Sequence, residues 1–320
     1  MFLQFERMKI NNIKRLIVTN ILLKVFSLQF SAVLIVLFSI LWLSSCTSPS
    51  ANNKEQINSS NNSNKTNAPI DSLKNISSAY IKDVEIPETQ PGEVVISHTA
   101  YTLSYNSKFK QSNWVAYELT GKETNSLYER ANEFTADPNI STGTASDKDY
   151  KSSGYDKGHL APAADMGWSS VTMKESFFYS NVSPQLPGFN RGIWKELEEL
   201  VRTWAIENDT VYVVTGPVLT KDLPTIGIDN VSVPKYFYKV VLDYSNPEIK
   251  GIGFIFPNAS SDKPLQNFAV SIDSVEIFTG INFFPLLPDA QENTIEKNLC
   301  ITCWSWGNSK NTKKIKVVKK

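Results

Sequence analysis

The chain has 320 residues, 41% of them hydrophobic and 20% charged, which is an ordinary composition for a globular protein and names no function. Basic and acidic residues number 32 each, and without the first 46 residues 27 basic and 31 acidic residues remain, a net charge near −4. This balance excludes a protein that coats nucleic acid through bulk positive charge, although it leaves room for an enzyme with a local basic cleft.

The beginning of the chain has the pattern of an export signal. Five basic residues precede "SAVLIVLFSILWLSSC", whose apolar core is about a dozen residues long and therefore short for a membrane span. Its end, "LSSC", resembles the lipobox of bacterial lipoproteins, in which the thiol of the cysteine, here Cys46, receives a diacylglycerol. We therefore expect a signal peptide over residues 1–46 and a protein held in the bacterial cell envelope by an N-terminal lipid, either periplasmic or surface-exposed. An uncleaved signal anchor with an incidental cysteine is the alternative.

The next segment predicts a flexible tether over residues 47–90. It contains "TSPSANNKEQINSSNNSNKTNAP", which is rich in Ser and Asn and has hardly any apolar residue, so it cannot bury enough surface to fold. A folded domain is expected over residues 91–295, followed by a C-terminal extension over residues 296–320.

Four segments of the expected domain read as β-strands. They are rich in β-branched and aromatic residues and are bounded by Asn, Pro and Gly: residues 113–120, 210–219, 236–244 and 249–258. A helix is also predicted between the first and second of these strands, so we expect a domain that contains both helices and strands.

That helix is expected over residues 188–209, "GFNRGIWKELEELVRTWAIEND". Apolar residues at steps of three and four form a stripe that faces the core: Ile193, Leu197, Leu200, Val201 and Trp204. A second stripe at four-residue spacing runs beside it: Asn190, Trp194, Glu198 and Arg202. Residues four apart drift only about 40° around a helix, so an amide, a carboxylate and a guanidinium should share one edge of the core face. By itself this pattern also fits a solvated edge with a Glu198–Arg202 ion pair, worth about 0.3–0.5 kcal/mol.

The chain has only two histidines and three cysteines. His98, in "VVISHTAY", has no acid, base or cysteine at a spacing that chemistry uses, whereas His159 lies in the polar stretch "SGYDKGHLAPAADM". Cys300 and Cys303, in "NLCITCWSWG" of the C-terminal extension, favour a local disulfide in an exported protein, since the ligands for a metal site are missing. A CxxC redox lipoprotein is kept as an alternative, although the motif lies far from the start of the domain. The lysine-rich end of the extension, "SKNTKKIKVVKK", is typical of a solvated tail.

The segments taken together resemble a known family. "YDKGHLAPAADM", followed by "SNVSPQLPGFNRGIWKELEELVR", closely resembles the paired signatures of the DNA/RNA non-specific endonuclease family, the endonuclease G-like ββα-metal or His-Me finger nucleases. The likeness includes "VAYELT", "RANEFTADP", "VYVVTGPVL" and "SVEIFTGINFFPLLPD" and covers roughly residues 97–289. A DxGH motif alone is a weak pattern, but in this order with NxxxWxxLE it is specific. The resemblance implies an α+β fold with a mixed, mainly antiparallel sheet core, helices, and a ββα-metal motif.

The resemblance also implies roles for individual residues. His159 resembles the general base, Asn190 the direct protein ligand of a hydrated Mg²⁺ that Mn²⁺ can replace, and Glu198 the carboxylate that orients metal-bound water. The remaining expected residues are Asn181, which helps to hold the site, Arg202 and Arg130, which contact the substrate, and Asp156, a structural partner within its motif. Imidazole with a pKa of about 6.5 suits a base near pH 7, and Mg²⁺ keeps most of its waters, so one amide oxygen can suffice as its ligand.

One position departs from the family pattern, because Lys157 stands where the family usually has Arg in DRGH. A bidentate grip on phosphate becomes a point charge, which concerns substrate positioning more than chemistry. The expected function is Mg²⁺-dependent, sequence-nonspecific hydrolysis of DNA and RNA to 5′-phosphate products. The alternative is an inactive envelope lipoprotein of the same fold that binds nucleic acid or another partner.

Overall fold

The computed structural model describes residues 80–307 of the chain. The predicted signal peptide, Cys46, most of the predicted tether and the lysine-rich end of the chain lie outside these residues. Between residues 80 and 307, no helix is both long enough and apolar enough to cross a membrane.

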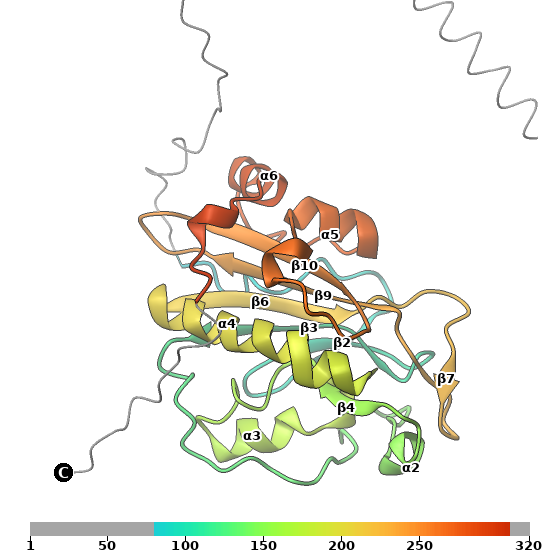
Figure 1. Cartoon of the computed structure of the whole chain (residues 1–320). Helices are drawn as coiled ribbons and strands as arrows, with labels where there is room; N and C mark the ends of the chain where they lie inside the picture. Colours follow the sequence, from blue (N-terminus) through green and yellow to red (C-terminus); the bar gives the residue numbers. More distant parts are fainter. Residues whose placement is uncertain (1–79, 308–320) are drawn as a thin grey trace, which may run out of the picture. The chain divides into compact units, whose positions relative to one another are not determined.

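A seven-stranded sheet, in the order β1-β2-β3-β6-β9-β10-β11, is the centre of the domain, and all its neighbouring strands are antiparallel (Figure 1). The strands are β1 Val94–Ser97, β2 Thr102–Asn106, β3 Gln111–Thr120, β6 Thr210–Pro217, β9 Tyr236–Asp243, β10 Lys250–Pro257 and β11 Ala269–Val270. The four strands predicted from the sequence are β3, β6, β9 and β10, so these predictions are confirmed. The fold is α+β with a mainly antiparallel sheet, as expected.

Smaller elements surround this sheet. Two two-stranded sheets pair β4 Asp156–His159 with β5 Val182–Gln185, and β7 Thr225–Ile226 with β8 Val231–Ser232. The α-helices are α2 Asp147–Tyr150, α3 Ser170–Ser176, α4 Trp194–Glu207, α5 Ile272–Thr279 and α6 Asp289–Lys297. Short 3₁₀ turns are η2 Tyr179–Asn181, η4 Leu265–Phe268 and η5 Ile301–Cys303, and a π-helical turn, η3 Phe189–Ile193, precedes α4.

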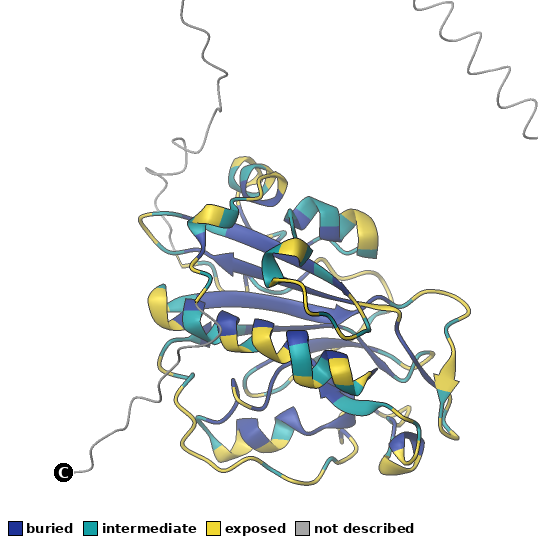
Figure 2. Ribbon diagram, viewed as in Figure 1, coloured by how far each residue is buried: buried dark blue, intermediate teal, exposed yellow. Residues whose placement is uncertain are grey.

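The sheet is buried on both faces, and the period of two along its strands divides the core (Figure 2). On β3, Val115 and Tyr117 face the first half of the core, which α4 covers, whereas Trp114 and Ala116 face the second half, which α5 and α6 cover. All five apolar residues of the predicted helix stripe are buried in the first half. Burial of that stripe explains why this amphipathic segment is a helix in this position.

Gly251 on β10 lets α5 and α6 approach the sheet closely. A Cβ at this position would lie 2.6 Å from Ile272 Cδ1 of α5 and 2.8 Å from Ile295 Cγ2 of α6. A larger residue would therefore displace the side chains of Ile272 and Ile295. Ile272 of α5 and Ile295 of α6 therefore both pack over Gly251.

The packed part of the chain extends beyond both predicted domain boundaries. Val84 is fully buried in the second half of the core, although residues up to 90 were assigned to the tether. At the other end, Trp304 is 4% exposed, and its ring centroid lies 4.4 Å from that of Trp204. The Trp204 indole N–H also donates to the carbonyl of Ser305 at 2.6 Å. Val84 and Trp304 lie in short segments outside the predicted strands and the predicted helix, so no repeating pattern in the sequence indicates that they pack into the core.

Candidate active site

Two antiparallel strands, which are separated in the chain by α3 and η2, and a helix come together in a ββα arrangement at one end of the domain. Strands β4 and β5 pair antiparallel, with His159 opposite Val182 and Asp156 opposite Gln185. Gly158 on β4 leaves room for Gln185 on β5, because a Cβ at position 158 would overlap the Gln185 side chain. The π-turn and α4 follow β5 directly along the chain.

The helix that was predicted over residues 188–209 begins later than expected. The prediction of one continuous polar stripe on a single helix is therefore wrong. Gly192 has φ −104° and ψ −119°, outside the helical region, so the regular α-helix starts only at Trp194. Asn190 therefore lies on the π-turn, while Glu198 and Arg202 lie on α4. Trp194, the fourth member of the stripe, is fully buried against the rings of Phe189 and Phe237.

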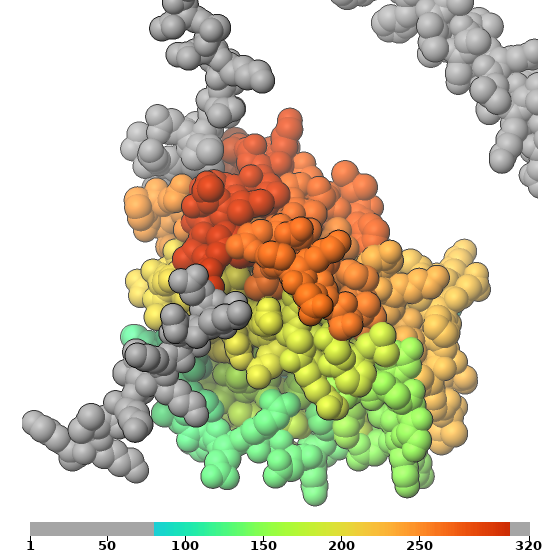
Figure 3. Space-filling view, in the orientation of Figure 1, coloured from blue at the N-terminus to red at the C-terminus, as the bar shows by residue number. Residues whose placement is uncertain are grey.

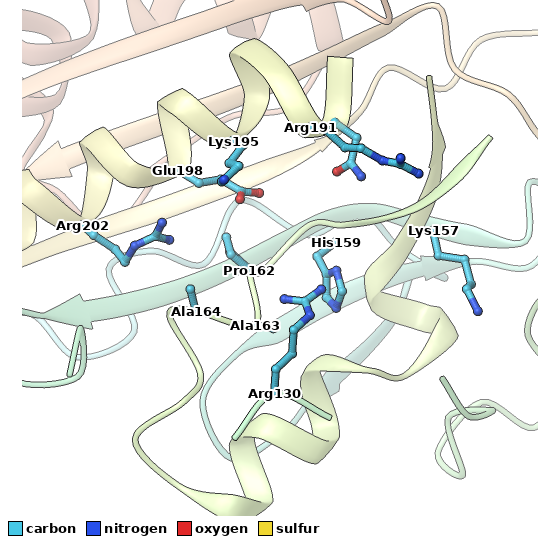
Figure 4. Close-up of a pocket in the computed structure, with 11 residues that line it drawn as sticks. Arg130, Lys157, His159, Pro162, Ala163, Ala164, Arg191, Lys195, Glu198 and Arg202 are labelled. Atoms are coloured by element: carbon cyan, nitrogen blue, oxygen red, sulfur yellow. The ribbon is translucent and has the colours of Figure 1, made fainter. Parts of the chain in front are cut away.

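An open cleft of about 450 Å³ lies between strand β4 with the loop that follows β4, the segment of Arg130, and the turn η3 with helix α4 (Figure 4). It contains most of the predicted site residues, from segments far apart in the sequence. Its lining residues are Arg130, Lys157, His159, Pro162, Ala163, Ala164, Asn190, Arg191, Lys195, Glu198 and Arg202.

His159 lies in the wall of this cleft, with its ring against aromatic side chains. The ring centroid is 4.8 Å from that of Phe177 and 5.1 Å from that of Phe134, and within residues 80–307 its buried Nε2 has no hydrogen-bond partner. Burial, and then the positive charges of Arg130 and Lys157, lowers the pKa of His159 to about 3. The imidazole is consequently neutral at physiological pH. A neutral ring with an unsatisfied buried nitrogen is suited to exchange a proton with a molecule bound in the cleft.

Asn190 is oriented by Asp156. The Asn190 Nδ2 donates to Asp156 Oδ2 at 2.9 Å, and Arg191 donates to both oxygens of the same carboxylate, at 2.7 and 2.5 Å. These hydrogen bonds outweigh the effect of burial and lower the pKa of Asp156, which keeps it ionised. An ionised carboxylate only accepts, so the amide nitrogen of Asn190 must face it, and Oδ1 is left as an acceptor for the cleft.

Glu198 and Arg202, both half-buried at the cleft, belong to a charged cluster that continues into the core, where Asp165 is buried. Arg202 Nη1 pairs with Asp165 Oδ1 at 2.7 Å rather than with Glu198, and the Tyr117 hydroxyl donates to the other Asp165 oxygen at 2.9 Å. Burial raises the pKa of Glu198 to about 7, against the opposing field of Lys239. The solvated edge considered from the sequence is therefore not what the structure contains.

Lys239 is a member of this cluster that the sequence analysis missed. It is fully buried on β9, with its ammonium 4.9 Å from the centre of the Trp194 ring and without a hydrogen-bond partner in the described part of the chain. Burial lowers its pKa to about 8, while Glu198 and then Asp165 act in the opposite direction. A signal was present, because a lone lysine in "YFYKVVLDY" falls on the same strand face as Phe237 and Val241.

The two predicted substrate-binding cations near His159 differ in their surroundings. Lys157 Nζ pairs with Asp147 Oδ1 at 2.5 Å, lies 4.4 Å from the centre of the Phe134 ring, and points away from His159 (Figure 4). Arg130 is exposed and lies over the Phe177 ring at 5.1 Å. Arg130 thus presents its charge to the cleft, whereas much of the Lys157 charge is already neutralised.

Asn181 is fully buried and does not line the cleft. Its Oδ1 accepts from the Ala161 backbone N–H at 2.8 Å, and its Nδ2 donates to the carbonyls of Ala161 and Ser176 at 2.9 and 2.8 Å. These bonds use the whole amide to hold the backbone that follows His159. Its geometry is that of a positioning residue.

The other histidine and the two C-terminal cysteines lie outside the cleft. His98 Nε2 is hydrogen-bonded to Asp137 Oδ2 at 2.9 Å in a buried pair, and 39 residues separate the two in sequence. Cys300 and Cys303 are bonded to each other across the turn η5.

The cleft therefore combines a neutral imidazole, a free amide oxygen, a half-buried carboxylate and several cations, which are the groups that an enzyme uses to cleave phosphate esters. The family comparison agrees with this class. The model of the DNA/RNA non-specific endonuclease family matches residues 77–290, so the chain belongs to that family and is a non-specific endonuclease, a hydrolase.

Individual relatives give the same result. The chain is 33% identical over 204 residues to mitochondrial endonuclease G of Bos taurus, covering 59% of this chain and 68% of the relative. It is 35% identical over 212 residues to nuclease C1 of Cunninghamella echinulata var. echinulata, covering 60% and 83%. A chain in the crystal structure of the EndoG/EndoGI complex matches with a TM-score of 0.58 and 33% identity, covering 62% of this chain and 88% of that chain.

Nucleases of this family depend on a metal ion, and the residues of the cleft fit a hard dication. Mg²⁺ prefers oxygen ligands and keeps several of its waters. Asn190 offers Oδ1 because Asp156 holds its nitrogen, and the Glu198 carboxylate lines the same cleft. In the described residues, the cleft itself offers no cysteine and only one histidine, a donor set that favours Mg²⁺ over softer metals.

Proposed function

We propose that the protein hydrolyses phosphodiester bonds of DNA and RNA with Mg²⁺ as cofactor and releases 5′-phosphate products. The neutral His159, buried in the cleft wall with Nε2 unsatisfied, is the observation that carries this proposal. In this scheme His159 is the general base that accepts a proton from the attacking water. Asn190 Oδ1 is the direct protein ligand of Mg²⁺, and Glu198 orients water around it.

The cations of the cleft bind the substrate backbone. Arg130 contacts a phosphate directly, because its guanidinium is exposed at the cleft. Arg202 uses one nitrogen on Asp165 and keeps its other donors for a second phosphate. When bound, Mg²⁺ supplies positive charge for the phosphate oxygens and for the leaving 3′ oxygen.

A plasmid-nicking assay tests this function. The purified domain should convert supercoiled plasmid to open and linear forms with Mg²⁺ or Mn²⁺, and EDTA should stop the conversion. His159→Ala should reduce turnover by at least ~10²-fold, which is the lower end of what a general base contributes. An unchanged melting temperature of this variant would show that it is folded. Full activity of this variant would refute the role of His159.

We also propose that the protein is a bacterial lipoprotein anchored in the envelope through Cys46. The support is the basic start, the short apolar run and the "LSSC" end of that run. Cys46→Ser should abolish incorporation of a fatty-acid probe and release the protein from membranes. If size and membrane fractionation stay unchanged, the segment is an uncleaved anchor instead.

A further inference from the structure

Three carboxylates meet on α5 and α6, on the face of the sheet that lies away from the nuclease cleft. They belong to Asp273 and Glu276, which are three residues apart on one face of α5, and to Glu296 on α6. One oxygen of each lies within 4.8 Å of an oxygen of the other two. Both helices lie together at the upper end of the domain, whereas β4 and α3 lie at the lower end (Figures 1 and 3).

The Glu296 side chain shows that this cluster is more than a group of surface acids. The residue is 4% exposed, and its buried Oε1 has no hydrogen-bond partner within residues 80–307. A buried polar atom without a partner is rare and destabilising, so it points to a missing ligand. This oxygen belongs to a carboxylate that converges on the two carboxylates of α5.

The charge around the cluster has one sign. Burial, and then the neighbouring carboxylates of Glu276, Glu292 and Asp273, raises the pKa of Glu296 to about 9. No ion pair among the described residues joins a lysine or an arginine to Asp273, Glu276 or Glu296. Within residues 80–307, the Phe283 backbone N–H donates to Glu276 Oε1 at 2.8 Å.

We propose that Asp273, Glu276 and Glu296 form a binding site for a structural divalent cation of the size of Ca²⁺. The cation joins α5 to α6 above Gly251, where the two helices meet over the sheet. It satisfies the orphaned oxygen of Glu296 and neutralises two of the three negative charges. The site is separate from the nuclease centre and does not depend on the proposed catalytic roles.

The spacing of the oxygens favours Ca²⁺ over Mg²⁺. Two oxygens bound to one ion lie at most twice the metal–oxygen distance apart, which is about 5.2 Å at the longest Ca²⁺ distance of ~2.6 Å and about 4.2 Å at the Mg²⁺ distance of ~2.1 Å. The three oxygens lie within 4.8 Å of one another, so they can share a Ca²⁺ ion without moving, whereas any pair more than about 4.2 Å apart would have to move closer for Mg²⁺. Ca²⁺ also tolerates irregular ligand geometry, whereas Mg²⁺ requires a near-octahedral arrangement.

Thermal unfolding with CaCl₂, MgCl₂ or EDTA tests the site on the folded protein. At a Ca²⁺ concentration of about 100 times Kd, the melting temperature of the wild type should rise by roughly 5–10 °C over its value in EDTA. Mg²⁺ at the same concentration should produce a clearly smaller rise. Glu296→Gln and the more exposed Asp273→Asn should both lose most of the Ca²⁺ response. Glu292→Gln, a matched carboxylate on α6 outside the three ligands, should keep it.

Isothermal titration of the same proteins gives a second measurement. The wild type and Glu292→Gln should bind one Ca²⁺ more than Glu296→Gln and Asp273→Asn. An equal Ca²⁺ response in the wild type and Glu296→Gln would overturn the proposal, and Glu296 would then be a protonated buried acid. A rise with Mg²⁺ that equals the rise with Ca²⁺ and is lost in Glu296→Gln would overturn the assignment to an ion of Ca²⁺ size.

Discussion

The pH dependence of catalysis should be controlled by Glu198 and not by the histidine. The pKa of His159 is lowered to about 3, so this base is neutral at every pH used for nuclease assays. Burial raises the pKa of Glu198 to about 7, so its ionised form is lost as the pH falls below neutrality. If ionised Glu198 is the active form, kcat/KM at one unit below its pKa falls to about a tenth of its plateau.

The assay measures kcat/KM on a short nucleic-acid duplex between pH 5 and pH 9. All measurements use one saturating Mg²⁺ concentration, because a bound dication lowers the pKa of any nearby carboxyl. The wild type should show an acid limb. Glu198→Gln should show a plateau lowered by roughly 10–100-fold, as for other groups that orient metal ligands, and no acid limb. Glu199→Gln, a matched change at an exposed neighbour on α4, should retain the wild-type profile.

Lys239→Met gives a second test with the opposite direction. The positive charge of Lys239 favours ionised Glu198, so its removal should raise the pKa of Glu198 and move the acid limb to higher pH. The two groups form no ion pair within 4 Å among the described residues, which sets an upper limit of about 4 kcal/mol, or roughly three pKa units, on their interaction. An acid limb that is identical in the wild type, Glu198→Gln and Lys239→Met would show that the limb belongs to another group.

Three further changes test the metal ligand, the substrate contact and the disulfide. Asn190→Ala should lose activity severely at every Mg²⁺ concentration, and a titration that follows the wild type would rule out Asn190 as the ligand. Arg130→Gln should raise KM more than it lowers kcat and should reduce the salt dependence of log KM by about one unit of slope, whereas an unchanged slope would mean that Arg130 contacts no phosphate. Replacement of both Cys300 and Cys303 by Ser should keep turnover within a few-fold and lower the melting temperature only slightly, because so short a loop restricts the unfolded chain little. A large loss of turnover in that variant, with the fold intact, would contradict a purely structural disulfide.

The sequence predicted those features that repeat along the chain. Strands β3, β6, β9 and β10 are buried on both faces, so each is a run of β-branched and aromatic residues bounded by turn residues, and the three- and four-residue steps of α4 result from burial of one helix face. The family resemblance added the grouping of distant segments around His159. Backbone irregularity was not predictable in this way. The π-turn depends on the conformation of Gly192, and neighbouring residue types do not reveal it.

Hydrogen bonds between side chains that are distant in the sequence also could not be predicted. Tyr117 and Asp165 are 48 residues apart, and Asp156 and Asn190 are 34 residues apart, yet each pair is hydrogen-bonded. Such partners are set by the strand order and by the path of the loop after β4. They decide which atom of Asn190 faces the cleft, and hence its suitability as a ligand.

The distribution of ion pairs in the cleft connects substrate binding to the strength of the base. Among the cleft-lining cations of residues 80–307, Arg130 is the one without a carboxylate partner, since Lys157, Arg191, Lys195 and Arg202 are each paired. Arg130 and Lys157 are also the two charges that lower the pKa of His159 in addition to burial. A phosphate bound at Arg130, as proposed, would neutralise that charge and so raise the pKa of His159, while burial, the largest cause of the lowered pKa, would continue to act. We therefore expect His159 to have a higher proton affinity with a phosphodiester at Arg130 than in the free protein.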